Sequence, residues 1–518
     1  MVHLHPILCS LLLVLGVIEA ESCNAPSIAD SQVLNSSSFI GSAASAHPLK
    51  PLFKFYPDAS LMHTDGGNSG ARDDQGPLGI DPHIRSSSAK VLMMVWGSDG
   101  SMTCGYANTT ISSSAPKLGL VAMDPSTLQI QAAWYPPGNE TLRFSYMEYI
   151  KETDDIVVST YQGHVYVVHR GTCGTTPCFT TTRTISLAGA FLSGEQLLNA
   201  MYDTAGNIWF TTGGTINGGD AAQESFTFGY VTPNGTVVKE HVHGEFVENG
   251  IAVSGLDVYM VSGPTAMANA SNATGYMYSV TSGREGAKIK WRAPYTAGLD
   301  ADGDVRGSGS SPVLLQDNYV AITDRSSPQV KLNIFHQKTQ NSTDKQVLCK
   351  VPLFTPGKSN NDNAVLGHFD GKTHGVIIQN NYGIPPVYQP EPDVPVDVNG
   401  KWNDMSGMAG GMTRIDINPN GTCSMRWTNT ELAIKGVSIM STRSGLIYGY
   451  VQDTERSPRG EYVWYVAAVD WDTGRTVYKV RTGAGGTYND NYLQASVGPD
   501  GTFYQTVFGG IVGVRDGQ

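Results

Sequence analysis

The sequence predicts an all-β fold built from many short antiparallel strands. Glycine accounts for 59 of the 518 residues, an abundance typical of chains with many tight turns. Charged residues make up only 15% of the chain and apolar residues 40%, so the chain can bury a large core and is not a disordered polypeptide. No long amphipathic helical pattern interrupts the strand-like segments.

A unit of about 50 residues repeats along the chain, a period typical of propellers and solenoids. One half of the unit consists of a polar or small pair, a short apolar strand, a turn and a second alternating strand. Seven copies of this half begin at Tyr146, Leu198, Glu248, Ser310, Asp362, Val437 and Asp490.

The other half of the unit is a hairpin with Asp before its turn and an aromatic residue near the end of its second strand. Clear examples are residues 120–135, 412–427 and 466–480. Asp caps such a turn, and Gly accepts the positive φ that the turn requires. Two hairpins per unit give a four-stranded antiparallel sheet, which is a propeller blade.

We therefore predict a β-propeller of seven four-stranded blades around a central channel, in a single domain over residues 90–518. The even spacing of the units disfavours the alternative, a pair of β-sandwiches. Residues 21–89 are irregular, and we expect them to pack on or cap the propeller. The final GGIVGVRDG is expected to supply a strand that closes the ring with N-terminal residues.

The N-terminus has the pattern of a secretory signal peptide over residues 1–20. Residues 7–18 form an apolar run, and Ala20 offers a small residue for cleavage, although no Lys or Arg precedes the run. The run is too short to span a membrane, and no other stretch could do so. Eight N-x-S/T sequons follow, as expected for a secreted, N-glycosylated protein. Their asparagines are Asn35, Asn108, Asn139, Asn234, Asn269, Asn272, Asn341 and Asn420.

Six cysteines remain once Cys9 leaves with the signal peptide. An even number in an oxidising compartment predicts three disulfides, although six cysteines permit many connectivities. We expect one bond to close a short loop, one to pin the N-terminal segment and one to join neighbouring blades. The expected pairs are Cys173–Cys178, Cys23–Cys104 and Cys349–Cys423, in that order. The spacing of the first pair and the lack of a second pair disfavour a metal site.

Composition and motifs exclude several function classes. The net charge of −12 and the absence of basic runs argue against a nucleic-acid partner. No H-E-x-x-H zinc motif, G-x-S-x-G elbow or P-loop occurs, and we predict neither a metal nor a cofactor. Asp300, Asp302 and Asp304 imitate the start of a calcium loop. Val305 and Ser311 occupy the positions that require Gly and Glu, so a solvated acidic turn is favoured over a looser calcium site.

The polar residues that open the repeats form the candidate site. The first strand of every blade lines the channel, so these residues converge near one mouth. The acids are Glu248, Asp362 and Asp490, and the amides are Asn199, Asn249, Asn363 and Asn491. Two roles stay open for them. They bond the bare ends of the inner strands or channel water, or they bind a ligand and exchange protons with it.

Two further groups of residues are expected near the same mouth. The first comes from the irregular N-terminal segment and comprises His63, Asp65, Arg72 and Asp73, which are expected to cap the mouth. The second comprises aromatic residues that either wall the site or belong to the core, namely Tyr146, Trp209, Tyr382 and Tyr492.

The hairpin VAAVDWDTGRTVYKV resembles the blade signatures of quinoprotein-type propellers. Over most of its length the chain also resembles a group of secreted fungal β-propeller proteins of specialised-metabolite pathways. The matching features are the signal peptide, HTDGGNSGARD, GNIWFTTGG, VENGIAV and the two NDN triplets. Some members of that group are hetero-Diels–Alderases that join tropolone-derived quinone methides to a sesquiterpene partner. The resemblance thus implies an enzyme with small hydrophobic substrates, but it carries no catalytic motif.

On this hypothesis, one of the three acids is the general acid for dehydration to a quinone methide. The four amides would orient the carbonyl oxygen, aromatic walls such as Tyr146 would stack the diene, and His63 and Asp65 would close the site. Two alternatives remain. One is a quinoprotein-like or sugar-processing oxidoreductase or lyase, which would need a cofactor or metal in the channel. The other is a non-enzymatic binding propeller such as a lectin.

Overall fold

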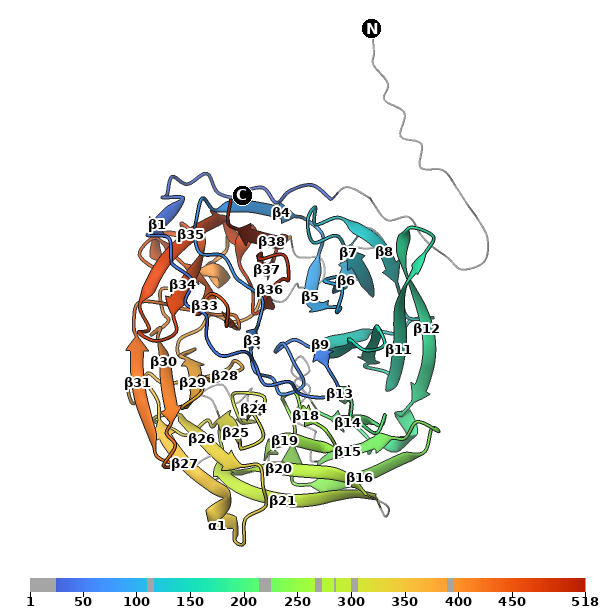
Figure 1. The fold of residues 1–518 in the computed structure, drawn as a ribbon. Helices are drawn as coiled ribbons and strands as arrows, with labels where there is room; N and C mark the ends of the chain where they lie inside the picture. Colours follow the sequence, from blue (N-terminus) through green and yellow to red (C-terminus); the bar gives the residue numbers. More distant parts are fainter. Residues whose placement is uncertain are drawn as a thin grey trace.

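The computed structural model describes residues 25–109, 116–213, 225–265, 273–283, 286–299, 306–388 and 395–517. Within these residues, eight sheets of four or more strands, each built on four antiparallel strands, are arranged around one axis, so the chain is an eight-bladed β-propeller (Figure 1). The predicted signal peptide, Cys23 and the acidic turn at Asp300 to Asp304 lie outside the described residues.

Each blade runs from an inner strand near the axis to an outer strand at the rim. Blade 1 consists of β5 (Val91–Trp96), β6 (Met102–Asn108), β7 (Lys117–Met123) and β8 (Ile130–Trp134), and blade 2 of β9 (Leu142–Ile150), β10 (Asp155–Thr160), β11 (His164–Cys173) and β12 (Thr176–Ser186). Blade 3 consists of β13 (Leu197–Tyr202), β14 (Ile208–Thr212), β15 (Ser225–Val231) and β16 (Val237–His243). Blade 4 consists of β18 (Ala252–Ser254), β19 (Asp257–Pro264), β20 (Thr274–Gly283) and β21 (Gly286–Thr296), and β17 (Glu245–Phe246) also pairs with β19.

Blade 5 consists of β24 (Val313–Leu315), β25 (Tyr319–Thr323), β26 (Lys331–His336) and β27 (Val347–Pro352), and blade 6 of β28 (Leu366–Phe369), β29 (His374–Gln379), β30 (Met412–Ile417) and β31 (Cys423–Asn429). Blade 7 consists of β32 (Ile439–Ser441), β33 (Leu446–Gln452), β34 (Val463–Asp470) and β35 (Thr476–Ala484). Blade 8 consists of β36 (Ala495–Val497), β37 (Phe503–Val507), β38 (Gly510–Arg515) and β4 (His83–Ser87).

The remaining elements are short and lie between or beside the blades. They are β1 (Phe39–Gly41), β2 (Ala59–Ser60), β3 (Ala71–Arg72), the pair β22 (Gly298–Leu299) and β23 (Arg306–Gly307), helix α1 (Thr343–Gln346), and the single turns η1 (Ala188–Ala190), η4 (Lys401–Asn403), η5 (Ser457–Arg459) and η6 (Gly486–Tyr488).

The predicted number of seven blades is wrong. The hairpin at residues 120–135 is the outer half of blade 1, and the inner half that precedes it, β5 and β6, was not recognised. Ser86 to Ser88, Ala89 and Lys90 stand before β5, without the acid or amide that opens most other copies. The repeat pattern depended on that polar opening, so it missed a blade whose inner strands are otherwise ordinary buried strands.

The ring closes through strands from both ends of the chain. β38, near the C-terminus, pairs antiparallel with β4, from the N-terminal segment, with Ile511 opposite Ser87 and Arg515 opposite His83. This closure is the one expected from the final GGIVGVRDG. The pairing completes the last blade, so the ring has no break between its last and first blades. It also makes β4, which belongs to the irregular N-terminal segment, a blade strand.

Residues 59–74, which we call the axial segment, cross the centre of the ring (Figure 1). Its two ends pair with inner strands, β2 with β9 and β3 with β32. Between them, its carbonyl oxygens accept hydrogen bonds of 2.7 to 3.0 Å from the inner-strand residues Val253, Leu314, Gly367 and Met440. Those backbone N–H groups face the axis and would otherwise lack an acceptor within the protein.

Tryptophan side chains dock two of the blades onto their neighbours. Trp427, on the outer strand of blade 6, lies over Gly474 in a turn of blade 7, and its Nε1 donates to the carbonyl of Trp471 at 2.9 Å. A Cβ on Gly474 would lie 2.4 Å from the indole. Trp291 repeats the contact from blade 4, donating to the Gln337 carbonyl in blade 5 at 2.9 Å. In the hairpin at residues 412–427, the terminal aromatic residue is therefore a docking residue.

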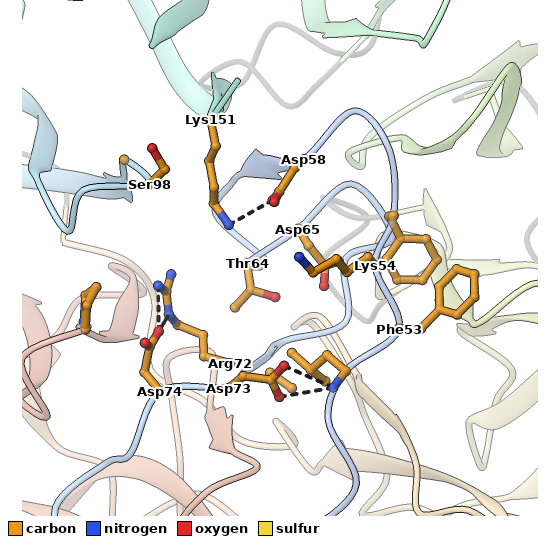
Figure 2. Close-up of a pocket in the computed structure, with 15 residues that line it drawn as sticks. Phe53, Lys54, Asp58, Thr64, Asp65, Arg72, Asp73, Asp74, Ser98 and Lys151 are labelled. Atoms are coloured by element: carbon orange, nitrogen blue, oxygen red, sulfur yellow. Dashed lines mark hydrogen bonds and ion pairs between the residues drawn. The ribbon is translucent and has the colours of Figure 1, made fainter. Parts of the chain in front are cut away.

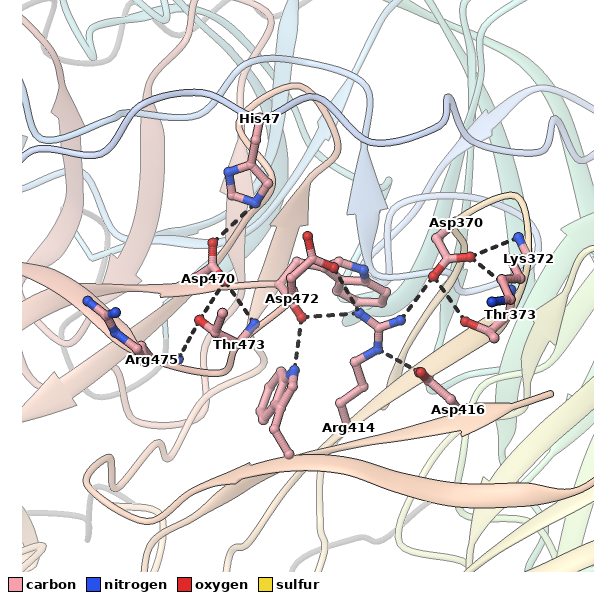
Figure 3. A network of polar contacts seen from close by, with 12 residues as sticks. His47, Asp370, Lys372, Thr373, Arg414, Asp416, Asp470, Asp472, Thr473 and Arg475 are labelled. Carbon is pink, nitrogen blue, oxygen red and sulfur yellow. Dashed lines mark hydrogen bonds and ion pairs between the residues drawn. The ribbon is translucent and has the colours of Figure 1, made fainter.

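A buried arginine reinforces the junction between blades 6 and 7 (Figure 3). The Arg414 guanidinium bonds Asp416 at 2.6 Å and Asp370 at 3.1 Å, and it lies 4.2 Å from the centre of the Trp471 ring. Asp470, the acid before the turn of the neighbouring hairpin, accepts the Thr473 N–H at 2.8 Å. One sequence pattern thus supplies both the turn and the contact between blades.

Two of the three predicted disulfides are present. Cys173–Cys178 closes the β11–β12 hairpin, and Cys349–Cys423 joins blades 5 and 6 at their outer strands. The predicted bond to Cys104 is not formed: within the described part of the chain Cys104 carries a free thiol, buried in the core of blade 1, and burial raises its pKa to about 12. A cysteine in β6 behaves as a small apolar core residue.

Glycosylation remains a prediction, but the structure separates the sequons by exposure. Asn108 is fully buried on β6, whereas the other described sequon asparagines are exposed; Asn269 and Asn272 lie outside the described residues. A buried asparagine is a poor acceptor in a folded protein, because glycans require surface. The exposed asparagines are Asn35, Asn139, Asn234, Asn341 and Asn420.

The docking contact predicts a specific cost for enlarging Gly474. Gly474→Ala should lower the free energy of unfolding by about 3 kcal/mol, because the new methyl meets the Trp427 indole and the residue keeps a φ of +72°. The matched control is Gly460→Ala, at a φ of +73° with no atom within 4 Å of the new Cβ, which measures the backbone cost alone. Chemical denaturation of both variants tests the prediction, and equal losses would refute the docking role.

Candidate functional site

The residues predicted to open the inner strands lie in two groups around the ring. One group lies on blades 2 to 4 and comprises Tyr146, Asn199, Glu248 and Asn249. The other lies at or before the inner strands of blades 6 to 8 and comprises Asp362, Asn363, Asp490 and Asn491.

Three of the four predicted amides bond the backbone of the next blade. Asn199 Nδ2 donates to the Asn249 carbonyl at 3.2 Å, and Asn249 Nδ2 donates to the Ser308 carbonyl at 3.0 Å. Asn363 Nδ2 donates to the Lys435 carbonyl at 2.7 Å. Each bond crosses from one blade to the following one, so these side-chain nitrogens tie the mouth of the ring together.

Asp490 and Lys435 form the most unusual pair at this mouth. Both residues are fully buried. Asp490 Oδ2 accepts the Gly436 N–H at 3.0 Å, but within the described part of the chain neither Asp490 Oδ1 nor Lys435 Nζ has a hydrogen-bond partner. Burial raises the pKa of Asp490 to about 6, partly offset by the positive charge of Lys435. Burial lowers the pKa of Lys435 to about 8, partly offset by Asp490.

An ion pair, Arg325–Asp362, lies beside these two residues, and Tyr492 contacts both groups. The buried Arg325 guanidinium pairs with the half-buried Asp362 carboxylate, which also shares a hydrogen bond with the Tyr492 hydroxyl. The Tyr492 ring centre is 5.4 Å from Lys435 Nζ. Burial and then the charge of Asp362 raise the pKa of Tyr492 well above its ordinary value, so the phenol is protonated at neutral pH.

The backbone that presents Tyr492 is strained. Asn491 has a φ of +41° and Tyr492 a φ of +65°, in the left-handed region that a bulky side chain rarely adopts. Asn491 Oδ1 accepts the Tyr388 N–H at 2.9 Å, and its own N–H donates to Asn489 Oδ1 at 2.8 Å, so surrounding bonds hold the turn. Strain of this kind gathers at functional sites.

The group on blades 2 to 4 is held mainly by packing. The Tyr146 ring lies against Gly250, where a Cβ would be 2.6 Å from it, and Tyr146 bonds Ser311. Burial raises the pKa of Tyr146, with a smaller contribution from the negative charge of the half-buried Glu248. Among the other candidate walls, Trp209 belongs to the core and donates to Asp203 at 2.9 Å, and Tyr382 is an exposed residue.

His63 and Asp65 belong to the axial segment. His63 is buried, and burial lowers its pKa to about 4, so its imidazole is neutral at physiological pH. Asp65 holds the turn that follows it by accepting the Gly67 N–H at 3.0 Å and two bonds from Ser69. Asp65 lines a cavity next to Lys151, which follows the end of β9, and therefore lies where inner strands end rather than where they begin.

Sequence reasoning missed Lys435 and Arg325. Each is a lone basic residue in the short connection near an inner strand: Lys435 stands four residues before β32, and Arg325 two residues after β25. A single basic residue in an otherwise apolar or small-residue stretch was the available signal. Glu148, two residues into the first recognised copy, lies near the end of β9, where its Oε2 accepts the Tyr202 N–H at 2.8 Å.

Among the described residues, no three or more His, Cys, Asp or Glu side chains come close enough together to hold a metal ion. Within the same residues, no helix has the length and apolar character needed to cross a membrane.

Comparison with known sequences gives little. No model of a known protein family matches the chain. An uncharacterized protein of Archaeoglobus fulgidus is 24% identical over 265 residues, which cover 45% of this chain and 47% of that protein. The chain therefore spans about half the length of the curated relative that it matches.

Comparison with solved structures returns propellers. The quinohemoprotein alcohol dehydrogenase of Comamonas testosteroni superposes with a TM-score of 0.53 at 9% identity, over 89% of this chain and 81% of that one. Sqt1 of Chaetomium thermophilum gives 0.47 at 10% identity, over 86% and 100% of the two chains. The WD40 domain of SCAP from fission yeast gives 0.42 at 9% identity, over 82% and 95%. At such identities the likeness to the dehydrogenase shows a shared β-propeller fold and nothing finer.

Proposed function

We propose that the chain is an enzyme that acts on a small organic substrate by acid–base catalysis at the cluster around Asp490. The observation that carries the proposal is the pair Asp490 and Lys435, two fully buried side chains that each keep one polar atom without a hydrogen-bond partner among the described residues. Leaving a buried charge unpaired costs several kcal/mol, so such a pair is expected where a ligand completes it.

The two groups offer complementary proton chemistry. With a pKa of about 6, Asp490 is partly protonated in a mildly acidic medium and can give a proton to a leaving group. Lys435, with a pKa of about 8, stays mostly protonated there and can donate a hydrogen bond to a carbonyl oxygen. Tyr492 adds a ring surface next to both groups.

Asp490 is the best supported of the three predicted acids. Asp362 is already engaged by Arg325 and Tyr492. Glu248 lies with the other group of residues, on blade 4. Asp490 alone combines full burial, a pKa raised toward neutrality and a free oxygen atom within the described residues.

The finer form of the proposal follows the resemblance to fungal hetero-Diels–Alderases. Asp490 protonates the hydroxyl leaving group of a tropolone-type polyketide, the C–O bond breaks, and water leaves. The Asp490 carboxylate then takes the ring hydroxyl proton, which yields a neutral quinone methide and restores the acid. Lys435 holds the ring carbonyl while the quinone methide adds to a terpene partner, a step that needs orientation and no net proton transfer.

A second candidate is a quinone-dependent oxidoreductase, favoured by the likeness in fold to the quinohemoprotein dehydrogenase. An anionic quinone would find cations in Lys435 and Arg325 and a stacking surface in Tyr492. However, Arg325 is paired with Asp362, and the axial segment bonds inner strands across the centre of the ring. These residues fit an acid–base site better than a quinone site.

The acid–base proposal predicts a large loss of activity when Asp490 is replaced. Asp490→Asn should lower the rate of product formation by about 10²-fold or more, because the amide cannot give up a proton. In the unaltered enzyme the rate should fall as the pH rises through about 6, where Asp490 loses its proton. Chromatography with mass detection on a tropolone-type alcohol and a terpene acceptor measures both effects.

Asp344→Asn, on the exposed helix α1, is the matched control and should leave the rate unchanged. Undiminished yield and stereochemistry in Asp490→Asn would refute the assignment. A visible absorption band of a bound quinone in the purified protein, together with alcohol oxidation, would favour the second candidate instead.

The same substitution should change stability in the opposite direction. The native-state pKa of Asp490 is about 6 and the ordinary value is 3.8, so ionisation above pH 6 destabilises the fold, and this cost is absent below about pH 4. Asp490→Asn should therefore raise the free energy of unfolding at pH 8 by up to about 3 kcal/mol and change it little near pH 4. Denaturation at both pH values tests this. A less stable variant at pH 8 would mean that Asp490 serves as a structural counter-ion of Lys435.

A further inference from the structure

A cavity of about 310 Å³ lies where the inner strands end (Figure 2). Residues 52–74 form most of its wall. The rest comes from the turns that follow inner strands, at Ser98 after β5, Lys151 after β9 and Pro499 after β36. The Asp490 cluster lies before the inner strands begin, so this cavity is a separate site and does not depend on the proposed function.

The charges in the cavity are nearly balanced and mostly paired. Asp58 bonds Lys151 at 2.9 Å, and Arg72 bonds Asp74 at 2.8 Å (Figure 2). Asp73 accepts the Leu52 N–H at 3.0 Å and the Thr442 hydroxyl at 2.6 Å. Because most of its charged side chains are already paired, the cavity has little net field to select an anion or a cation.

The paired ions still offer hydrogen bonds to a ligand. Carboxylate oxygens accept several bonds each, and lysine and arginine donate several each, so the remaining positions present donors and acceptors side by side. Hydroxyl groups need both kinds of partner, because each donates one bond and accepts others. A ligand rich in hydroxyl groups matches this lining better than a purely apolar one, which would leave buried polar groups unsatisfied.

An exposed aromatic ring stands at the rim of this polar cavity. Phe53 is 38% exposed, and its ring meets Phe55 edge-on with 5.1 Å between the centres. Both residues line the cavity. Sugar rings have an apolar C–H face and a polar edge, and an aromatic wall beside charged pairs provides the complementary surface.

The wall of the cavity is rigid. The axial segment is hydrogen-bonded to inner strands of blades 4 to 7, and Asp65 fixes its central turn. Thr64, which lines the cavity, has a φ of +81°, a conformation that costs a β-branched residue energy and that the surrounding bonds impose. A preorganised wall binds a small ligand without paying to order the protein.

We propose that this cavity binds a neutral pyranose sugar unit. The sugar stacks its C–H face on Phe53 and directs its hydroxyl groups to the Asp58–Lys151 and Arg72–Asp74 pairs. Neither residue pair takes part in the acid–base cluster, so the site adds a saccharide-binding function on the opposite side of the axial segment.

Titration with methyl glycosides of glucose, galactose, mannose and N-acetylglucosamine tests the proposal, with enzymatic removal of the protein's own N-glycans beforehand. Ligand-observed NMR and calorimetry should find at least one glycoside that binds with a Kd on the order of 1 mM or tighter. Phe53→Ala and Lys151→Met should each weaken that binding at least about tenfold, which corresponds to about 1.4 kcal/mol.

Asp490→Asn is the matched control and should bind the glycoside as the unaltered protein does, which separates this site from the catalytic proposal. Phe53 is an exposed rim residue, so its variant should keep the melting temperature of the unaltered protein. The proposal is overturned if no glycoside binds, if inorganic phosphate or putrescine binds more tightly than every glycoside, or if both variants retain full affinity.

Discussion

The inner strands of a propeller turn one edge toward the axis, and the N–H groups on that edge need acceptors. In this protein the axial segment supplies them, with carbonyl oxygens bonded to inner strands of four successive blades. This constraint fixes residues 59–74 at the centre of the ring. It separates the space where the inner strands begin from the space where they end, and both candidate sites depend on that separation.

At the mouth where the inner strands begin, the acids and amides that open the repeats occupy similar positions in the sequence but have different roles in the fold. Asn199, Asn249 and Asn363 donate side-chain hydrogen bonds to the backbone of the next blade, so they link neighbouring blades at this mouth. Asp490 accepts a bond through one carboxylate oxygen only, and among the described residues Lys435 Nζ has no hydrogen-bond partner. The distinction between structural and chemical roles follows from which lone pairs and protons remain available.

The sequence predicted the architecture well because the architecture is local. Alternating strands recur in the blades, several hairpins add an Asp before the turn and a terminal aromatic residue, and each feature has a nearby physical cause. The predicted number of blades was wrong because of one place, before β5, where no acid or amide opens the copy. The predicted disulfide of Cys104 was wrong, because an even number of cysteines does not show whether a particular cysteine is buried in a core.

The candidate site was predicted less completely, since it depends on residues that the repeat does not align. The polar opening of the last copy identified Asp490. Its neighbour Lys435 comes from the connection before β32, and Arg325 from the turn after β25, so neither stands at a repeated position. Only the closed ring brings blades 5, 7 and 8 together at one mouth, and no spacing within a blade contains that information.

The same geometry explains how the fold sustains unfavourable local structure. Buried unpaired atoms at Lys435 and Asp490, and left-handed backbone at Tyr492 and Thr64, each cost free energy. They lie near the axis, whereas tryptophan docking, the Arg414 network and the Cys349–Cys423 bond stabilise the blade junctions farther out. In a closed ring every blade has two neighbours, so an inner strand cannot move without disturbing two blade junctions. The stability of those junctions therefore also stabilises the residues near the axis. The rim therefore supplies the rigidity that the strained central residues require.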